Sequence, residues 1–158
     1  MSEKYALIVD VDKCAGCRMC ETVCSLGHEG KVIPSKARIS VIKDEQNGID
    51  FPVFCQQCEQ PLCIEVCPTL ALTKDTETGI VSINENKCIG CAMCVMACPI
   101  GGIVVTDEKK MKKCNLCEGK PRCAANCPTK ALEYLQLTKI TKQKQRKGLG
   151  RMIRLIGN

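Results

Sequence analysis

Short apolar segments alternate with polar turns along this chain, and none of the segments is long. Residues 5–11 are mostly apolar and predict a strand, and residues 18–26 predict a short helix. Residues 71–74 and 80–83 flank the turn-rich segment 75–79, a pattern that is typical of a hairpin. The chain is therefore expected to consist of short strands and helices joined by tight turns, which is the α+β class.

The longest interval between these elements spans residues 29–54. It predicts a strand at 38–43, a polar turn at 44–48 and a further extended segment at 49–54. We expect this interval to be an insertion that packs on one side of the protein or contacts a partner. A last strand is expected at residues 103–106, where the chain returns after a Cys-Pro turn.

Cysteine accounts for 16 of the 158 residues, whereas the chain has no Trp, two Phe and two Tyr. So few aromatic side chains give a thin hydrophobic core for a chain of this length. A cysteine content of roughly a tenth is also far above ordinary usage. Bound inorganic clusters would supply the missing core.

A secreted disulfide scaffold is the first alternative. The N-terminus has no basic stretch followed by a long apolar run, and no twin-arginine signal precedes the first cysteine. We therefore expect a cytoplasmic protein, in which disulfides are disfavoured. No stretch approaches the roughly eighteen uninterrupted apolar residues of a membrane span, so no transmembrane segment is expected.

The cysteines fall into four groups of four, with none left over. The first and third groups read CxxCxxCxxxC, while the second and fourth have a wider middle gap that contains Glu and then Pro. The two types alternate, which indicates duplication of a two-motif unit. The groups are Cys14, Cys17, Cys20, Cys24; Cys55, Cys58, Cys63, Cys67; Cys88, Cys91, Cys94, Cys98; and Cys114, Cys117, Cys123, Cys127.

This spacing favours iron–sulfur clusters over zinc. Three thiolates separated by two residues on a tight loop reach three corners of one iron cube, and in two-cluster ferredoxins the fourth cysteine of the motif binds the other cluster. Zinc motifs usually come as two separated CxxC pairs. The sequence thus predicts four 4Fe-4S clusters. Spacing alone is compatible both with tandem pairing of neighbouring groups and with a nested arrangement.

Charge is unevenly distributed along the chain. The net charge is +6, but residues 138–158 hold seven Lys or Arg and no acid, which leaves 16 basic and 17 acidic side chains elsewhere. We interpret residues 138–158 as a basic C-terminal tail that is either a docking segment or a solvated terminus. Nucleic acid is not expected as a partner, because the tail has no interleaved aromatic residues and no binding motif beside it.

Catalytic groups are not recognisable in the sequence. The lone His28 has no nucleophile beside it, and there is no Gly-rich nucleotide loop. We interpret His28 as a surface residue or as one that lies behind the ligands. Met19, Met93 and Met96 are expected to pack against cluster faces rather than to bind iron. The chain is therefore predicted to be an electron carrier and not an enzyme.

The four groups, their Cys-Pro endings and the widened second and fourth groups resemble the four-cluster ferredoxin-like electron-transfer subunits of molybdenum- and tungsten-pterin oxidoreductases. The resemblance covers residues 5–135. It implies two bacterial-ferredoxin-like units of βαβ type in one compact, cluster-filled domain at residues 1–137. It also implies that the outer motifs, 14–24 and 114–127, pair with each other, as do the inner motifs, 55–67 and 88–98.

The nested arrangement implies four ligand sets. They are Cys14, Cys17, Cys20, Cys127 (the first set); Cys114, Cys117, Cys123, Cys24 (the second); Cys55, Cys58, Cys63, Cys98 (the third); and Cys88, Cys91, Cys94, Cys67 (the fourth). The first group departs from the family pattern, because Ser25 rather than Pro follows its last cysteine.

The resemblance also implies a partner. The small size and the N-terminus look most like the small subunits of aldehyde:ferredoxin tungsten oxidoreductases, with carriers of formate dehydrogenase, hydrogenase and carbon monoxide dehydrogenase as alternatives. Such a subunit relays single electrons between a large catalytic subunit and ferredoxin or another acceptor. A free polyferredoxin and a scaffold with purely structural clusters are further alternatives, and self-association within a complex stays open.

Overall fold

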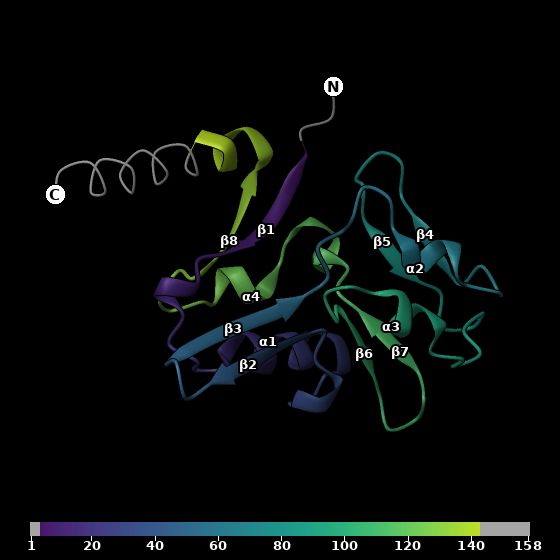
Figure 1. The fold of residues 1–158 in the computed structure, drawn as a ribbon, viewed down its shortest axis with the longest axis horizontal. Coiled ribbons are helices and arrows are strands. Elements are labelled where there is room, and N and C mark those ends of the chain that lie inside the picture. The colour runs from purple at the N-terminus through teal and green to yellow at the C-terminus, as the bar shows by residue number, and fades with distance from the viewer. Residues whose placement is uncertain (1–3, 143–158) are drawn as a thin grey trace, which may run out of the picture.

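The computed structural model describes residues 4–142, which form two lobes that lie side by side (Figure 1). The outer lobe contains β1 (Tyr5–Val9), α1 (Met19–Glu29), β2 (Ile39–Asp44), β3 (Ile49–Phe54), α4 (Arg122–Ala125) and β8 (Leu132–Gln136). The inner lobe contains α2 (Leu62–Glu65), β4 (Leu72–Lys74), β5 (Val81–Ile83), α3 (Met93–Ala97), β6 (Ile103–Val105) and β7 (Met111–Lys113). These short helices and strands confirm the α+β class.

The strands form four antiparallel pairs. β2 pairs with β3, β4 with β5, and β6 with β7, so that each of these pairs is local in sequence. The exception is β1, which pairs with β8 over the full length of both strands, from Tyr5 opposite Gln136 to Val9 opposite Leu132. This long-range pair brings the first cysteine group, which follows β1, close to the fourth, which precedes β8 (Figure 1).

Each lobe has its own hydrophobic core. The core of the outer lobe is built around Leu7, Phe54 and Leu132, and that of the inner lobe around Leu72 and Val81. Cysteines are part of both cores. Because the non-cysteine side chains in each core are few, whatever the cysteines bind contributes directly to the packing of each lobe.

The predicted local elements are largely present. The hairpin predicted at 71–83 is confirmed as β4 and β5, and the strand predicted at 103–106 is confirmed as β6. The strand predicted at 5–11 is shorter, because Asp10 makes its last ladder bond to the carbonyl of Ala131 and Val11 already begins a 3₁₀ turn. The first helix is longer than predicted, since α1 continues to Glu29.

The predicted insertion at residues 29–54 is an integral part of the outer lobe. Its strands β2 and β3 pair as a hairpin that packs against α1. The carboxylate of Glu21 on α1 is buried and accepts a hydrogen bond of 2.6 Å from the backbone N–H of Val41 on β2. Of the two roles expected for this interval, the structure shows packing on the body of the protein.

Ser25 explains why α1 is long. The other three groups end in Cys-Pro, and proline lacks the N–H that a helix needs at that point. Ser25 instead allows the helix to continue, is fully buried, and donates through Oγ to the carbonyl of Thr22. The same hydroxyl accepts from the N–H of Ile33 at 3.2 Å, which fastens the segment after the helix to its last turns.

Substituting Ser25 with proline tests this interpretation. We expect Ser25→Pro to cost about 3 kcal/mol, because it removes a helical hydrogen bond and its ring meets the preceding turn, and to lower the thermal midpoint by roughly 6–12 °C in a chain of this size. Ser25→Ala is the control, since it removes only the hydroxyl and costs about 1 kcal/mol. Circular dichroism melts measure both variants, and equal midpoints would contradict the interpretation.

Two further predictions concern the basic tail and a membrane span. The basic tail predicted at residues 138–158 lies outside the described residues from residue 143 onward. Among residues 4–142, no helix combines the length and the apolar character that crossing a membrane requires.

Candidate metal centres

The first cysteine set lies in the outer lobe, between the start of α1 and the end of the fourth group. Cys14, Cys17, Cys20 and Cys127 line one cavity together with Pro52 of β3. Cys17 is exposed at its rim, whereas Cys20 and Cys127 are buried. This cavity therefore joins residues that lie more than a hundred positions apart in the sequence.

The second set lies one helical turn further along α1, at Cys24. Cys24, Cys114, Cys117 and Cys123 line a second cavity of the outer lobe, and none of these four cysteines is classed as exposed. His28 also lines this cavity, with Nε2 3.7 Å from Sγ of Cys117. The structure thus places His28 directly behind a cysteine, as the sequence interpretation allowed.

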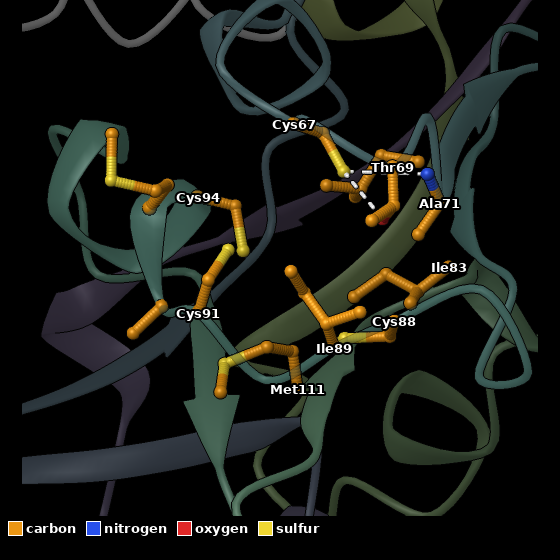
Figure 2. A pocket seen from close by; sticks show the side chains of 12 residues that line it. Cys67, Thr69, Ala71, Ile83, Cys88, Ile89, Cys91, Cys94 and Met111 are labelled. Atoms are coloured by element: carbon orange, nitrogen blue, oxygen red, sulfur yellow. Dashed lines mark hydrogen bonds between the residues drawn. The ribbon is translucent and has the colours of Figure 1, made fainter.

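The fourth set lies in the inner lobe and is shown in Figure 2. Cys67, Cys88, Cys91 and Cys94 line a cavity whose remaining lining is almost entirely apolar, including Ile83, Ile89 and Met111. The sulfurs of the four cysteines surround a common space in this view.

The third set lies where the two lobes meet. Burial raises the pKa of Cys63, the charge of Lys113 opposes this rise, and the thiols of Cys55, Cys98 and Cys58 add to it, so these four thiols lie within electrostatic reach of one another. Gly102 allows the close approach of the segments, because a methyl group at its α-carbon would lie only 2.8 Å from Cα of Cys55. The N–H of Gly102 donates to Sγ of Cys98 at 3.3 Å.

Helix pairing accounts for which cysteine groups lie near one another. α1 packs against α4, and α2 packs against α3. Each of these helices carries a cysteine of its own group, so each pair brings an early group and a late group together. The outer lobe accordingly gathers the first and fourth groups, and the inner lobe gathers the second and third.

Matching backbone conformations accompany the repeated sequence. Gly16 and Gly90 both have positive φ, at 59° and 72°, and so do Arg18 and Ala92, at 57° and 60°. Positive φ is uncommon for residues other than glycine. Its recurrence at the same place in the first and third groups indicates that the repeat extends to the cysteine-bearing loops themselves.

The last cysteine of each group lies against a backbone donor. In the second group the N–H of Ala71, four residues after Cys67, donates to its sulfur at 3.3 Å, and the third group repeats this spacing. In the first group α1 continues past Cys24, so the donor is instead the N–H of Arg38, again at 3.3 Å. Such donors stabilise negative charge on the sulfur and would tune any metal bound there.

These contacts divide the thiols into two electrostatic classes. Burial raises the pKa of Cys20 and of Cys114 to about 12. For Cys67 and Cys127 burial also opposes ionisation, but hydrogen bonds from backbone N–H groups and from Thr69 and Thr129 outweigh it and lower the pKa. A bound cation must therefore displace protons from the buried thiols, which couples metal binding to proton release.

The four sets have the chemistry that iron–sulfur clusters require. Each offers four thiols, and three of them surround a cavity whose lining includes no carboxylate. Within residues 4–142, no three His, Cys, Asp or Glu side chains converge tightly enough to hold one metal ion.

The sets also follow one another through the protein. Cys20 and Cys24 on α1 connect the first set to the second. Burial is the main cause of the raised pKa of Cys114, and Cys55 raises it further, so Cys55 lies within electrostatic reach of Cys114 and connects the second set to the third. Burial is also the main cause of the raised pKa of Cys94, and Cys63 raises it further, which connects the third set to the fourth.

Sequence patterns did not reveal every residue at these sites. Lys113 is buried, with Nζ 2.6 Å from Sγ of Cys55, but it follows three other lysines and gives no signal in the sequence.

The expectation for the methionines is only partly met. Met19 and Met93 line cavities, whereas Met96 is 85% exposed because it lies on the outer side of α3, so its predicted packing role is wrong.

Known proteins are similar to this chain over most of its length. The family described as 4Fe-4S dicluster domain matches residues 47–137. The polyferredoxin-like subunit of aliphatic sulfonate oxidoreductase from Pyrococcus furiosus is 42% identical over 129 residues, which are 80% of this chain and 73% of that protein. The putative electron transport protein YsaA of Escherichia coli is 38% identical and the alignment covers 89% of this chain and 95% of that protein. The electron transport protein HydN of Escherichia coli is 35% identical, with coverages of 85% and 89%.

Proposed function

Because the chain belongs to the family of proteins with a 4Fe-4S dicluster domain, we propose that it is an electron-transfer subunit that holds four 4Fe-4S clusters. It relays single electrons between a large catalytic oxidoreductase subunit and ferredoxin or another acceptor. Each cluster, when bound, supplies a one-electron couple. The protein contributes the thiolate ligands, the hydrogen bonds to them and the order in which the sites follow one another.

The grouping of the cysteines in space is the observation that carries this proposal. We assign the clusters to the four nested sets, since three of them share a cavity each and the third is gathered around Cys63. The pairing of α1 with α4 and of α2 with α3 supports this assignment over tandem pairing. Sixteen cysteines then serve as sixteen ligands.

The order of the sets suggests where electrons enter and leave. The first and fourth sets lie at the two ends of the series, and each has one exposed cysteine, Cys17 and Cys91 respectively. The second set has none among its four cysteines, whereas the third has the exposed Cys58. Because an electron passes all four sites only if it enters and leaves at the ends of the series, we place the contact with the catalytic subunit at one end and the contact with the acceptor at the other.

The relatives support an oxidoreductase partner. One of them is named as a subunit of an aliphatic sulfonate oxidoreductase, and two are named as electron transport proteins. On the motif resemblance, we propose a tungsten- or molybdenum-pterin subunit of aldehyde oxidoreductase type. Carriers of formate dehydrogenase, hydrogenase or carbon monoxide dehydrogenase are the alternatives of the same class.

Anaerobic analysis of the purified protein tests the proposal. We expect about sixteen iron and sixteen acid-labile sulfide per chain, with coupled cubane signals in the low-temperature EPR spectrum of the reduced protein. A redox titration should show reversible one-electron steps. Zinc in place of iron would contradict the metal assignment, and clusters that no low-potential donor reduces reversibly would contradict electron transfer and favour a structural role.

A further inference from the structure

Lys113 is a buried cation at the junction of the two lobes. It is the last residue of β7, it directly precedes Cys114 of the second set, and only 4% of its surface is exposed. Its Nζ donates to Sγ of Cys55, a cysteine of the third set, at 2.6 Å. One residue therefore touches the third set through its side chain and the second through its backbone.

This ammonium has no carboxylate partner. None of the ion pairs among residues 4–142 includes Lys113, and its side chain makes one hydrogen bond, to Cys55. The preceding Lys112 is different, because its Nζ lies 3.3 Å from Glu29 and 2.9 Å from Glu85. A buried ammonium is costly unless an anion compensates it, and the side chain of Lys113 has a sulfur of the third set, Sγ of Cys55, as its partner.

The third set supplies a compensating negative charge when it holds a cluster. Four thiolates around an oxidised 4Fe-4S core leave a net charge of about −2. The influence of Lys113 reaches beyond Cys55, since its charge partly counteracts the effect of burial, the main cause of the raised pKa of Cys63. The ammonium thus contacts one thiol that we assign to this site and lies within electrostatic reach of a second.

We propose that Lys113 raises the reduction potential of the cluster held by the third set. An electron that crosses between the lobes would then occupy this site preferentially. The proposal rests on the four-cluster function proposed above. Reduction adds one negative charge to the cluster, and a fixed cation in hydrogen-bond contact with a ligand stabilises the reduced form more than the oxidised form. Burial of Lys113 and Cys55 strengthens this effect, because water and salt screen their contact poorly.

Neutral substitution of Lys113 in the full-length, cluster-loaded protein tests the proposal. In Lys113→Met we expect one of the reduction steps to require at least a tenfold higher ratio of reductant to oxidant, which is a shift of about 59 mV to more negative potential for one electron. The other steps should stay where they are. An EPR-monitored redox titration at 10 K measures each step separately.

Lys112→Met is the matched control. It removes the same formal charge from the neighbouring position of β7, but its ammonium is paired with two carboxylates rather than with a cysteine. It should leave every reduction step in place. If Lys113→Met and Lys112→Met shift the titration alike, or if neither shifts it, the proposal is wrong.

Two further measurements keep the proposal testable if Lys113→Met fails to take up iron. Lys113→Arg retains the charge and should retain the wild-type potentials, while Lys113→Gln should show the negative shift. In the unsubstituted protein with ¹⁵N-labelled lysine side chains, electron–nuclear double resonance after addition of one electron per chain should detect a nitrogen coupled to the reduced cluster. Absence of that coupling overturns the proposal, whereas absence of reducible clusters would overturn the proposed function instead.

Discussion

Replacing Cys20 and Cys127 together is expected to cost the protein one intact 4Fe-4S cluster, the same loss as either single substitution. Both side chains line the same cavity of the outer lobe, next to Cys14 and Cys17. A site that has lost one of its four ligands is already defective, so removal of a second ligand from it adds little. The wild-type protein is expected to hold four clusters, and each of these three variants about three.

Cys20→Ala combined with Cys67→Ala is the matched comparison. These two cysteines line cavities in different lobes, so the double variant should lose two clusters. Tandem pairing of neighbouring groups would place Cys20 and Cys67 on one cluster and Cys127 on another. The variant at Cys20 and Cys67 would then lose one cluster, and the variant at Cys20 and Cys127 would lose two. Mössbauer spectroscopy of ⁵⁷Fe-labelled protein counts the intact four-iron clusters, and the reversed pattern would refute the nested assignment.

Removal of iron by an anaerobic chelator is expected to unfold both lobes. Among residues 4–142, six of the twenty buried hydrophobic side chains are cysteines, and the core of the inner lobe has only four other buried members. Without metal these thiols leave cavities in a protein with few aromatic side chains to fill them. Structural metal sites commonly contribute their binding energy to folding directly.

Small-angle X-ray scattering gives this prediction a clear readout. A folded chain of 158 residues has a radius of gyration of about 15 Å, and an unfolded one of about 42 Å. We expect the chelated protein, kept reduced to prevent disulfides, to approach the larger value. Reconstitution with iron and sulfide is the control and should restore compactness. A chelated protein that stays near the smaller radius would show that side-chain packing alone maintains the fold.

Local features were predictable because they depend on near neighbours. The hairpin at residues 71–83 follows from two short apolar runs and a turn between them, in which Asp75 accepts hydrogen bonds from the N–H groups of Glu77 and Thr78. Cysteine spacing likewise indicated iron–sulfur chemistry, which the family match supports. The end of β1 was less predictable, since its last ladder bond is to Ala131, which lies more than a hundred positions away. The sequence did contain the reason for the length of α1, because Ser25 stands where the other groups have proline.

The sequence by itself determined the α+β class, the duplicated cysteine motif and the kind of cofactor that sixteen thiols at this spacing bind, because these depend on residue type and on short separations along the chain. Only the tertiary structure decided which thiols lie together. That outcome depends on the pairing of β1 with β8 and of α1 with α4, which joins residues more than a hundred positions apart. The tertiary structure also decided that Lys113 is buried against Cys55, whereas the preceding Lys112 pairs with carboxylates. Two residues of the same type differ in this way because successive side chains of a strand point to opposite faces.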